Sequence, residues 1–202
     1  MLEKILPEVF TKEYYIYFRH RRENLLDEMM TKENEGLSCA KCVGNCCTFS
    51  SNSMRISPLE AVEILHFLEK NQRLNDKLVK HLENSIQEFR LDKENFYGIK
   101  KNYTCPFYMG KCEGCSISRR SKPYGCLAFN AVEKNVLEGT SCQSNKRALI
   151  RRENSYKEFE DACNKAIRKK FNLTWDLESI PVAILDLVNQ GGLCHPEIEI
   201  KS

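Results

Sequence analysis

Four cysteines within nine residues, Cys39, Cys42, Cys46 and Cys47, constrain this chain more than any other feature of its sequence. Two cysteines two residues apart, as at Cys39 and Cys42, form a turn in which both thiolates face one cation. Thiolates crowded around one point repel each other unless a cation neutralises them, so packing alone explains such a run poorly. The run therefore predicts a metal bound by sulfur.

A second cysteine region follows after a long interval. It spans residues 105–142 and contains Cys105, Cys112, Cys115, Cys126 and Cys142. Its many prolines and glycines and its lack of a helical period indicate an irregular segment, which metal ligation can hold together where a core cannot. Adjacent side chains point in different directions, so Cys46 and Cys47 suit two sites, or two metals of one cluster, better than one mononuclear centre. We expect residues 39–47 and 105–142 to interleave their ligands.

A disulfide framework is the alternative explanation for 11 cysteines in 202 residues. It requires an oxidising compartment, but the apolar run of residues 1–10 is interrupted by charges and a proline and does not resemble a signal peptide. The cysteine count is also odd. No segment approaches the ~20 apolar residues of a membrane span. The sequence therefore predicts a cytoplasmic protein, without a membrane partner, whose cysteines are metal ligands or redox groups.

Apolar residues at helical spacing predict a mostly α fold with little strand. The expected helices cover residues 8–33, 58–71, 75–90, 144–171 and 181–191. Ser57, Pro58 and Glu60 form a strong helix start, because serine caps, proline fits the first turn and glutamate can reach back as the capping-box partner. We expect one domain, 1–202, in which helices at 1–36 and 143–202 flank a cysteine-cluster region at 37–142 with a helical insertion at 57–91.

The charged residues of these helices are expected to face solvent. In the first helix the apolar face includes Tyr14, Tyr17 and Leu25, and Arg21 and Arg22 are assigned to other faces. The basic residues of the helix at 144–171, among them Arg152, are assigned to a solvated surface. His66 and His81 are expected to be surface or partly buried residues rather than ligands, since neither has a partner His or carboxylate in a metal-binding pattern. Cys163 is expected to be a core thiol, and the roles of Cys194 and His195 stay open.

The cysteine pattern resembles the YkgJ-type cysteine-cluster family, a zinc- or iron-chelating domain with eight cysteines. The residues that carry the resemblance are the C-x2-C-x3-C-C run, then Cys105-Pro-Phe, then the segment from Cys115-Ser-Ile to Lys122-Pro123 and Cys126. The resemblance covers residues 37–142 and implies the ligands Cys39, Cys42, Cys46, Cys47, Cys105, Cys115 and Cys126, with Cys142 as an eighth. This chain has three residues between Cys42 and Cys46, where many members have two. Cys112 is additional, so whether Cys112 or Cys115 ligates stays open.

Three classes of function follow. The first is a metal-binding protein that holds zinc or an iron–sulfur cluster, two cofactors that all-thiolate ligands do not distinguish. The second is implied by the resemblance: some relatives are flagellin lysine N-methylases thought to use an iron–sulfur cluster, so the partner would be a protein substrate. The third is a zinc-stabilised nucleic-acid-binding module that uses the basic residues 146–170. The net charge of +3 does not favour nucleic acid.

Overall fold

The computed structural model describes residues 1–37, 44–92, 101–110, 113–131, 142–191 and 193. Helices cover 62% of these residues and strands 7%, so the expected mostly α fold with little strand is confirmed. The elements follow one another in the order α1 (Leu2–Ile5), α2 (Lys12–Asn34), the 3-10 helix η2 (Asn45–Cys47), β1 (Arg55–Ile56), α3 (Pro58–Lys70), α4 (Asp76–Phe89), the 3-10 helix η3 (Arg119–Ser121), α5 (Tyr124–Leu127), β2 (Phe129–Ala131), β3 (Cys142–Ser144), α6 (Lys146–Phe171), β4 (Glu178–Ser179) and α7 (Ile180–Gly191).

Local capping sets the beginnings of the helices. The capping box at α3 is confirmed: Ser57 Oγ accepts from Glu60 N, and Glu60 Oε2 accepts from Ser57 N at 2.9 Å. At α4, Asn75 Oδ1 accepts from Leu78 N at 3.1 Å. The predicted start of the first helix at residue 8 is wrong, because α2 begins after Thr11, which accepts from the main chain three residues later.

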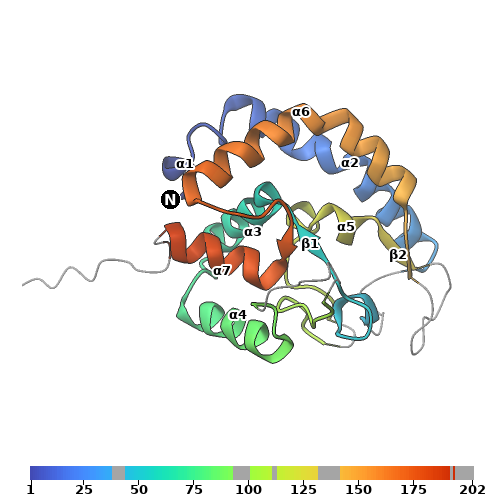
Figure 1. Ribbon diagram of the computed structural model, residues 1–202. Coiled ribbons are helices and arrows are strands. Elements are labelled where there is room, and N and C mark those ends of the chain that lie inside the picture. The colour runs from blue at the N-terminus through green and yellow to red at the C-terminus, as the bar shows by residue number, and fades with distance from the viewer. Residues whose placement is uncertain (38–43, 93–100, 111–112, 132–141, 192, 194–202) are drawn as a thin grey trace, which may run out of the picture.

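The helices form layers. Figure 1 shows α2 and α6 side by side above α3 and α7, with α4 packed against α7 on the far side. The larger core lies between these layers and draws on both ends of the chain, from Leu2 to Leu193. A smaller core lies where α2 meets α5 and the start of α6, around Leu25, Met29 and Leu127.

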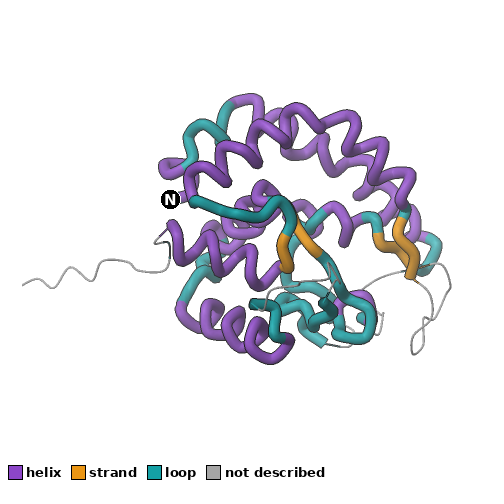
Figure 2. The backbone as a smooth tube through the Cα atoms, viewed as in Figure 1, coloured by secondary structure: helices purple, strands orange, loops and turns teal. Residues whose placement is uncertain are grey.

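Two antiparallel ribbons complete the fold. β1 pairs with β4, with Arg55 opposite Ser179, and β2 pairs with β3, with Ala131 opposite Cys142. The first ribbon joins the segment after η2 to the segment before α7. Figure 2 shows a group of loops beside α4, at the end of the fold away from α2 and α6.

Candidate metal centre

Cys46 and Cys47 lie in η2, which follows directly on Gly44. Gly44 has a φ of 74°, a left-handed conformation that residues with a side chain rarely adopt, and its carbonyl accepts from Cys47 N at 2.7 Å. A Cβ at this position would collide with the ring of Tyr108, which comes from the second cysteine region. The Sγ atoms of Cys46 and Cys47 are 4.0 Å apart, so the turn presents the two thiols as a pair.

The second cysteine loop is tied together and fastened to the helices. Tyr108 pairs with Cys115 in an antiparallel bridge, and Ser116 N donates to Phe107 O at 2.8 Å. Arg73, from the connection between α3 and α4, donates to the Ser116 carbonyl at 2.6 Å and to its hydroxyl at 2.9 Å. The buried Phe107 adds an apolar anchor. These contacts fix Cys115 relative to the helical insertion.

Main-chain hydrogen bonds join the two cysteine segments directly. Cys105 N donates to Cys47 O at 2.7 Å, and Tyr103 N donates to Asn52 O at 2.9 Å. The fully buried Tyr103 donates through its hydroxyl to Met54 O at 2.6 Å. Segments far apart in the sequence therefore lie side by side at the cysteines.

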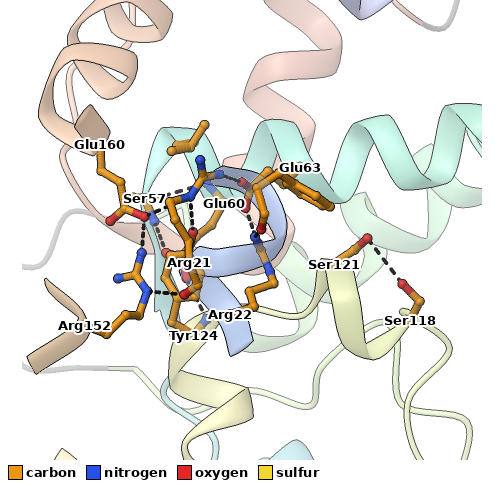
Figure 3. Close-up of polar contacts among 12 residues, drawn as sticks. Arg21, Arg22, Ser57, Glu60, Glu63, Ser118, Ser121, Tyr124, Arg152 and Glu160 are labelled. Carbon is orange, nitrogen blue, oxygen red and sulfur yellow. Dashed lines mark hydrogen bonds and ion pairs between the residues drawn. The ribbon is translucent and has the colours of Figure 1, made fainter. Parts of the chain in front are cut away.

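Cys126 is brought to this region by the short helix α5, which also carries Tyr124. Tyr124 N donates to Glu60 Oε1 at 2.9 Å, and its hydroxyl accepts from Arg21 Nε at 3.2 Å. The guanidinium of Arg152 lies over the Tyr124 ring, 3.2 Å from its centroid (Figure 3). A four-residue helix has little stability of its own, so these contacts hold the turn that carries Cys126.

The same contacts belong to a buried charge cluster that contradicts the sequence-based assignment of three arginines to solvent. Arg21 and Arg22 are each 1% exposed and Arg152 is 5% exposed. Glu63 forms ion pairs with both Arg21 and Arg22, and Glu160 pairs with Arg152 and, at 3.4 Å, with Arg21. Burial of three guanidinium groups is tolerated because carboxylates from α3 and α6 face them.

The signal that could have found this cluster is the helical phase. Arg21 and Arg22 lie three or four residues from both Phe18 and Leu25, so they share the apolar face of α2. Tyr17, which was expected on that face, is instead exposed. Sequence reasoning failed here because it assigned arginines to solvent by residue type rather than by position.

The pKa values of two buried thiols, Cys105 and Cys126, are raised by burial and by neighbouring cysteines. Burial raises the pKa of Cys105 to about 12, and the neighbouring Cys115 and Cys46 act in the same direction. Burial also raises the pKa of Cys126 well above its usual value, with Cys105, Cys115 and Cys46 adding to the effect. Lys122 opposes the shift at both Cys105 and Cys126. A bound cation would reverse this balance, because metal ligation deprotonates a thiol.

The remaining predicted ligands are placed as follows. Cys142 lies on β3, opposite Ala131, and Cys39, Cys42 and Cys112 lie outside the described residues. Among the residues that are described, no group of three or more His, Cys, Asp or Glu side chains is arranged to hold a metal ion. The metal ligand set therefore stays a prediction.

The positions of Cys163, His66 and His81 agree with the expected core thiol and with surface or partly buried histidines. Cys163 is a buried thiol in the larger core, on α6. His66 is partly buried, with its Nε2 at 3.5 Å from Glu3 Oε1 and its Nδ1 at 3.9 Å from Glu69 Oε2. The exposed His81 contacts the Pro106 carbonyl through Nε2, 3.1 Å away. Cys194 and His195 lie outside the described part of the chain.

Comparison of the chain with family models, with curated proteins and with solved structures finds no match. The resemblance to the cysteine-cluster family accordingly stays a prediction carried by the sequence motifs of residues 37–142. Within the described ranges, no helix is both long and apolar enough to cross a membrane.

Proposed function

We propose that this chain is a metal-binding protein that holds its metal through thiolates at the junction of η2, the second cysteine loop and α5. The observation that carries the proposal is the 2.7 Å hydrogen bond from Cys105 N to Cys47 O, because it fastens one cysteine segment to the other. The effect of Cys46 and Cys115 on the pKa of both Cys105 and Cys126 supports it. Further predicted ligands are Cys39, Cys42, Cys47, Cys112 and Cys142.

Two metals suit these donors. Zinc in a closed four-thiolate site would be structural and would add directly to the stability of loops that have little core of their own. An iron–sulfur cluster would permit electron transfer or radical chemistry. Protein lysine methylation, which the family resemblance implies, would use an iron–sulfur cluster. The identity of the metal therefore decides whether a methylation assay is needed.

Nucleic-acid binding through α6 stays a weaker prediction. One of the cations on which it relies, Arg152, is 5% exposed and faces Tyr124 and Glu160 instead of solvent. Affinity for nucleic acid that is undetectable, or that does not fall with salt, would remove this function.

The test is metal analysis of the protein purified without oxygen, together with its absorption spectrum. A colourless protein with stoichiometric zinc supports the structural site, and visible absorption with iron and sulfide supports a cluster. Cys46→Ser and Cys126→Ser should each lower the metal content and the melting temperature. Cys163→Ser is the matched control, because this buried thiol lies in the helical core, and its metal content should equal that of the parent.

Two outcomes reject the proposal. The first is full metal content and an unchanged melting temperature in both Cys46→Ser and Cys126→Ser. The second is a chelator-treated protein that keeps its helical circular dichroism and melting temperature with every thiol free to react.

A further inference from the structure

A small cavity lies next to Cys115, between the end of α2 and the second cysteine loop, and has a volume of about 140 Å³. This volume exceeds the roughly 10–15 Å³ that a single water needs and lies below the roughly 300–1,000 Å³ of pockets for drug-sized molecules. One wall is apolar and is made by Met29, Leu37 and Ile117. The cavity has room for a ligand of only a few atoms.

Two hydrogen-bond donors line the cavity without a matching acceptor in the part of the chain that the structure describes. Asn130, on β2, is 8% exposed, and its Nδ2 has no hydrogen-bond partner there. A buried donor left unpaired destabilises the fold, so a ligand that supplies the acceptor is favoured. Lys122 also lines the cavity and is half-buried, and within the described residues it forms no salt bridge. Together they offer an ammonium and an amide to an acceptor that the described residues do not supply.

The other charges of the cavity cancel or are screened. Arg119 and Glu33 form a two-point ion pair, with N–O distances of 2.6 and 2.7 Å. Glu113 is exposed, so water screens its charge. Lys122 is the cation of the cavity that forms no salt bridge among the described residues. A single positive charge suits a monoanion, and the apolar wall suits a short hydrocarbon chain.

We propose that this cavity binds a short-chain monocarboxylate. Its carboxylate accepts hydrogen bonds from Lys122 Nζ and Asn130 Nδ2, and its alkyl part packs against Met29, Leu37 and Ile117. A phosphate dianion fits less well, because one ammonium balances a single negative charge and the apolar wall offers phosphate no hydrogen-bond partner. The proposal does not depend on the metal, although it places the ligand next to a predicted metal ligand, Cys115.

The test is titration of the purified full-length protein with butyrate, followed by NMR or calorimetry. Saturable binding in the millimolar range is expected for so small a ligand. Lys122→Met removes the charge and Asn130→Asp replaces the donor with a carboxylate, so each should weaken binding about tenfold or more, as loss of a hydrogen bond to a charged group predicts. Lys170→Met, an exposed lysine at the end of α6, should leave the affinity unchanged.

Butyramide and inorganic phosphate are the matched ligands. Butyramide keeps the shape of butyrate without its charge and should bind at least tenfold more weakly. Absence of saturable butyrate binding, phosphate binding as tight as that of butyrate, or full affinity in Asn130→Asp overturns the proposal. Metal content measured on the same samples separates the two proposals, since a metal-free protein that binds butyrate rejects the metal and keeps the cavity ligand.

Discussion

Glu63→Gln tests whether the buried arginines depend on one carboxylate. The side chains of Arg21, Arg22 and Glu63 are between 0% and 1% exposed, and each carboxylate oxygen of Glu63 faces one arginine. Burial pushes the pKa of Glu63 up, but the two guanidinium groups outweigh it and hold the pKa below its usual value. The glutamine keeps the shape of the side chain and removes the charge.

The expected loss of stability in Glu63→Gln follows from the contacts that Arg21 and Arg22 still make. Arg21 retains Tyr124 Oη at 3.2 Å and Glu160 at 3.4 Å. Arg22 retains the Phe18 carbonyl at 3.3 Å and the rings of Phe18 and Tyr124, but no carboxylate among the described residues. Removal of one partner from a buried pair costs about 3–5 kcal/mol, because a charge is left buried without compensation. That is a large part of the 5–15 kcal/mol by which a typical domain is stable.

Urea unfolding followed by far-ultraviolet circular dichroism measures the effect. Asp161→Asn is the control, because the exposed Lys157–Asp161 pair should contribute nothing measurable. Arg22→Met in the Glu63→Gln background should recover part of the loss, since it removes the orphaned charge. A loss below about 1 kcal/mol in Glu63→Gln, or no recovery in the double variant, refutes the reasoning.

The pH dependence gives an independent sign. A carboxylate whose pKa is lowered on folding contributes stability above its unfolded value, here 4.5, and that contribution is lost as pH falls through the lower folded value. The parent protein should therefore lose this contribution below about pH 4.5. The stability of Glu63→Gln should change less with pH over the same range.

Three further predictions concern single positions. Ser57→Ala removes the α3 cap and should cost about 1 kcal/mol in urea unfolding, and an unchanged midpoint contradicts the capping role. Gly44→Ala combines a strained φ with a collision against Tyr108. It should lower the melting temperature more than Gly110→Ala, because Gly110 also has a positive φ, 103°, but open space around its Cβ position. Equal effects of the two substitutions would exclude the collision. Burial lowers the pKa of His66 below 6.5, so stability should fall as pH drops below that value, and His66→Asn should flatten this slope in urea titrations between about pH 7 and 5.

The helices were predictable because their signals are local. The cap of α3 lies within Ser57–Glu60, and that of α4 is Asn75, so sequence reasoning places both starts correctly. The predicted start of the first helix at residue 8 was wrong because it overlooked Thr11, which is a good N-cap. Capping acts over three or four residues and is readable in one sequence.

The features that could not be predicted from the sequence depend on contacts between residues far apart in the chain. The ribbon of β1 and β4 joins two-residue strands around Arg55 and Ser179, too short to give a sequence pattern of their own. Arg21 and Arg22 are buried because Glu63 lies opposite on α3, a contact that the sequence of α2 does not contain. The approach of Cys47 and Cys105 was expected from cysteine chemistry, but the hydrogen bonds that achieve it come from main-chain atoms, which carry no sequence signal.

The helix α5 links the buried cluster of arginines and glutamates to Cys126. Tyr124 is held at its main chain by Glu60, at its hydroxyl by Arg21 and at its ring by Arg152, and Cys126 follows two residues later in the same turn. The buried arginines therefore also orient the turn in which Cys126 lies. If α5 contributes Cys126 to the proposed metal site, Glu63→Gln, although distant from the cysteines in the sequence, should lower the metal content as well as the stability. A variant that lost several kcal/mol of stability but kept metal as firmly as the parent would separate the two regions and show that α5 is positioned by the thiols alone.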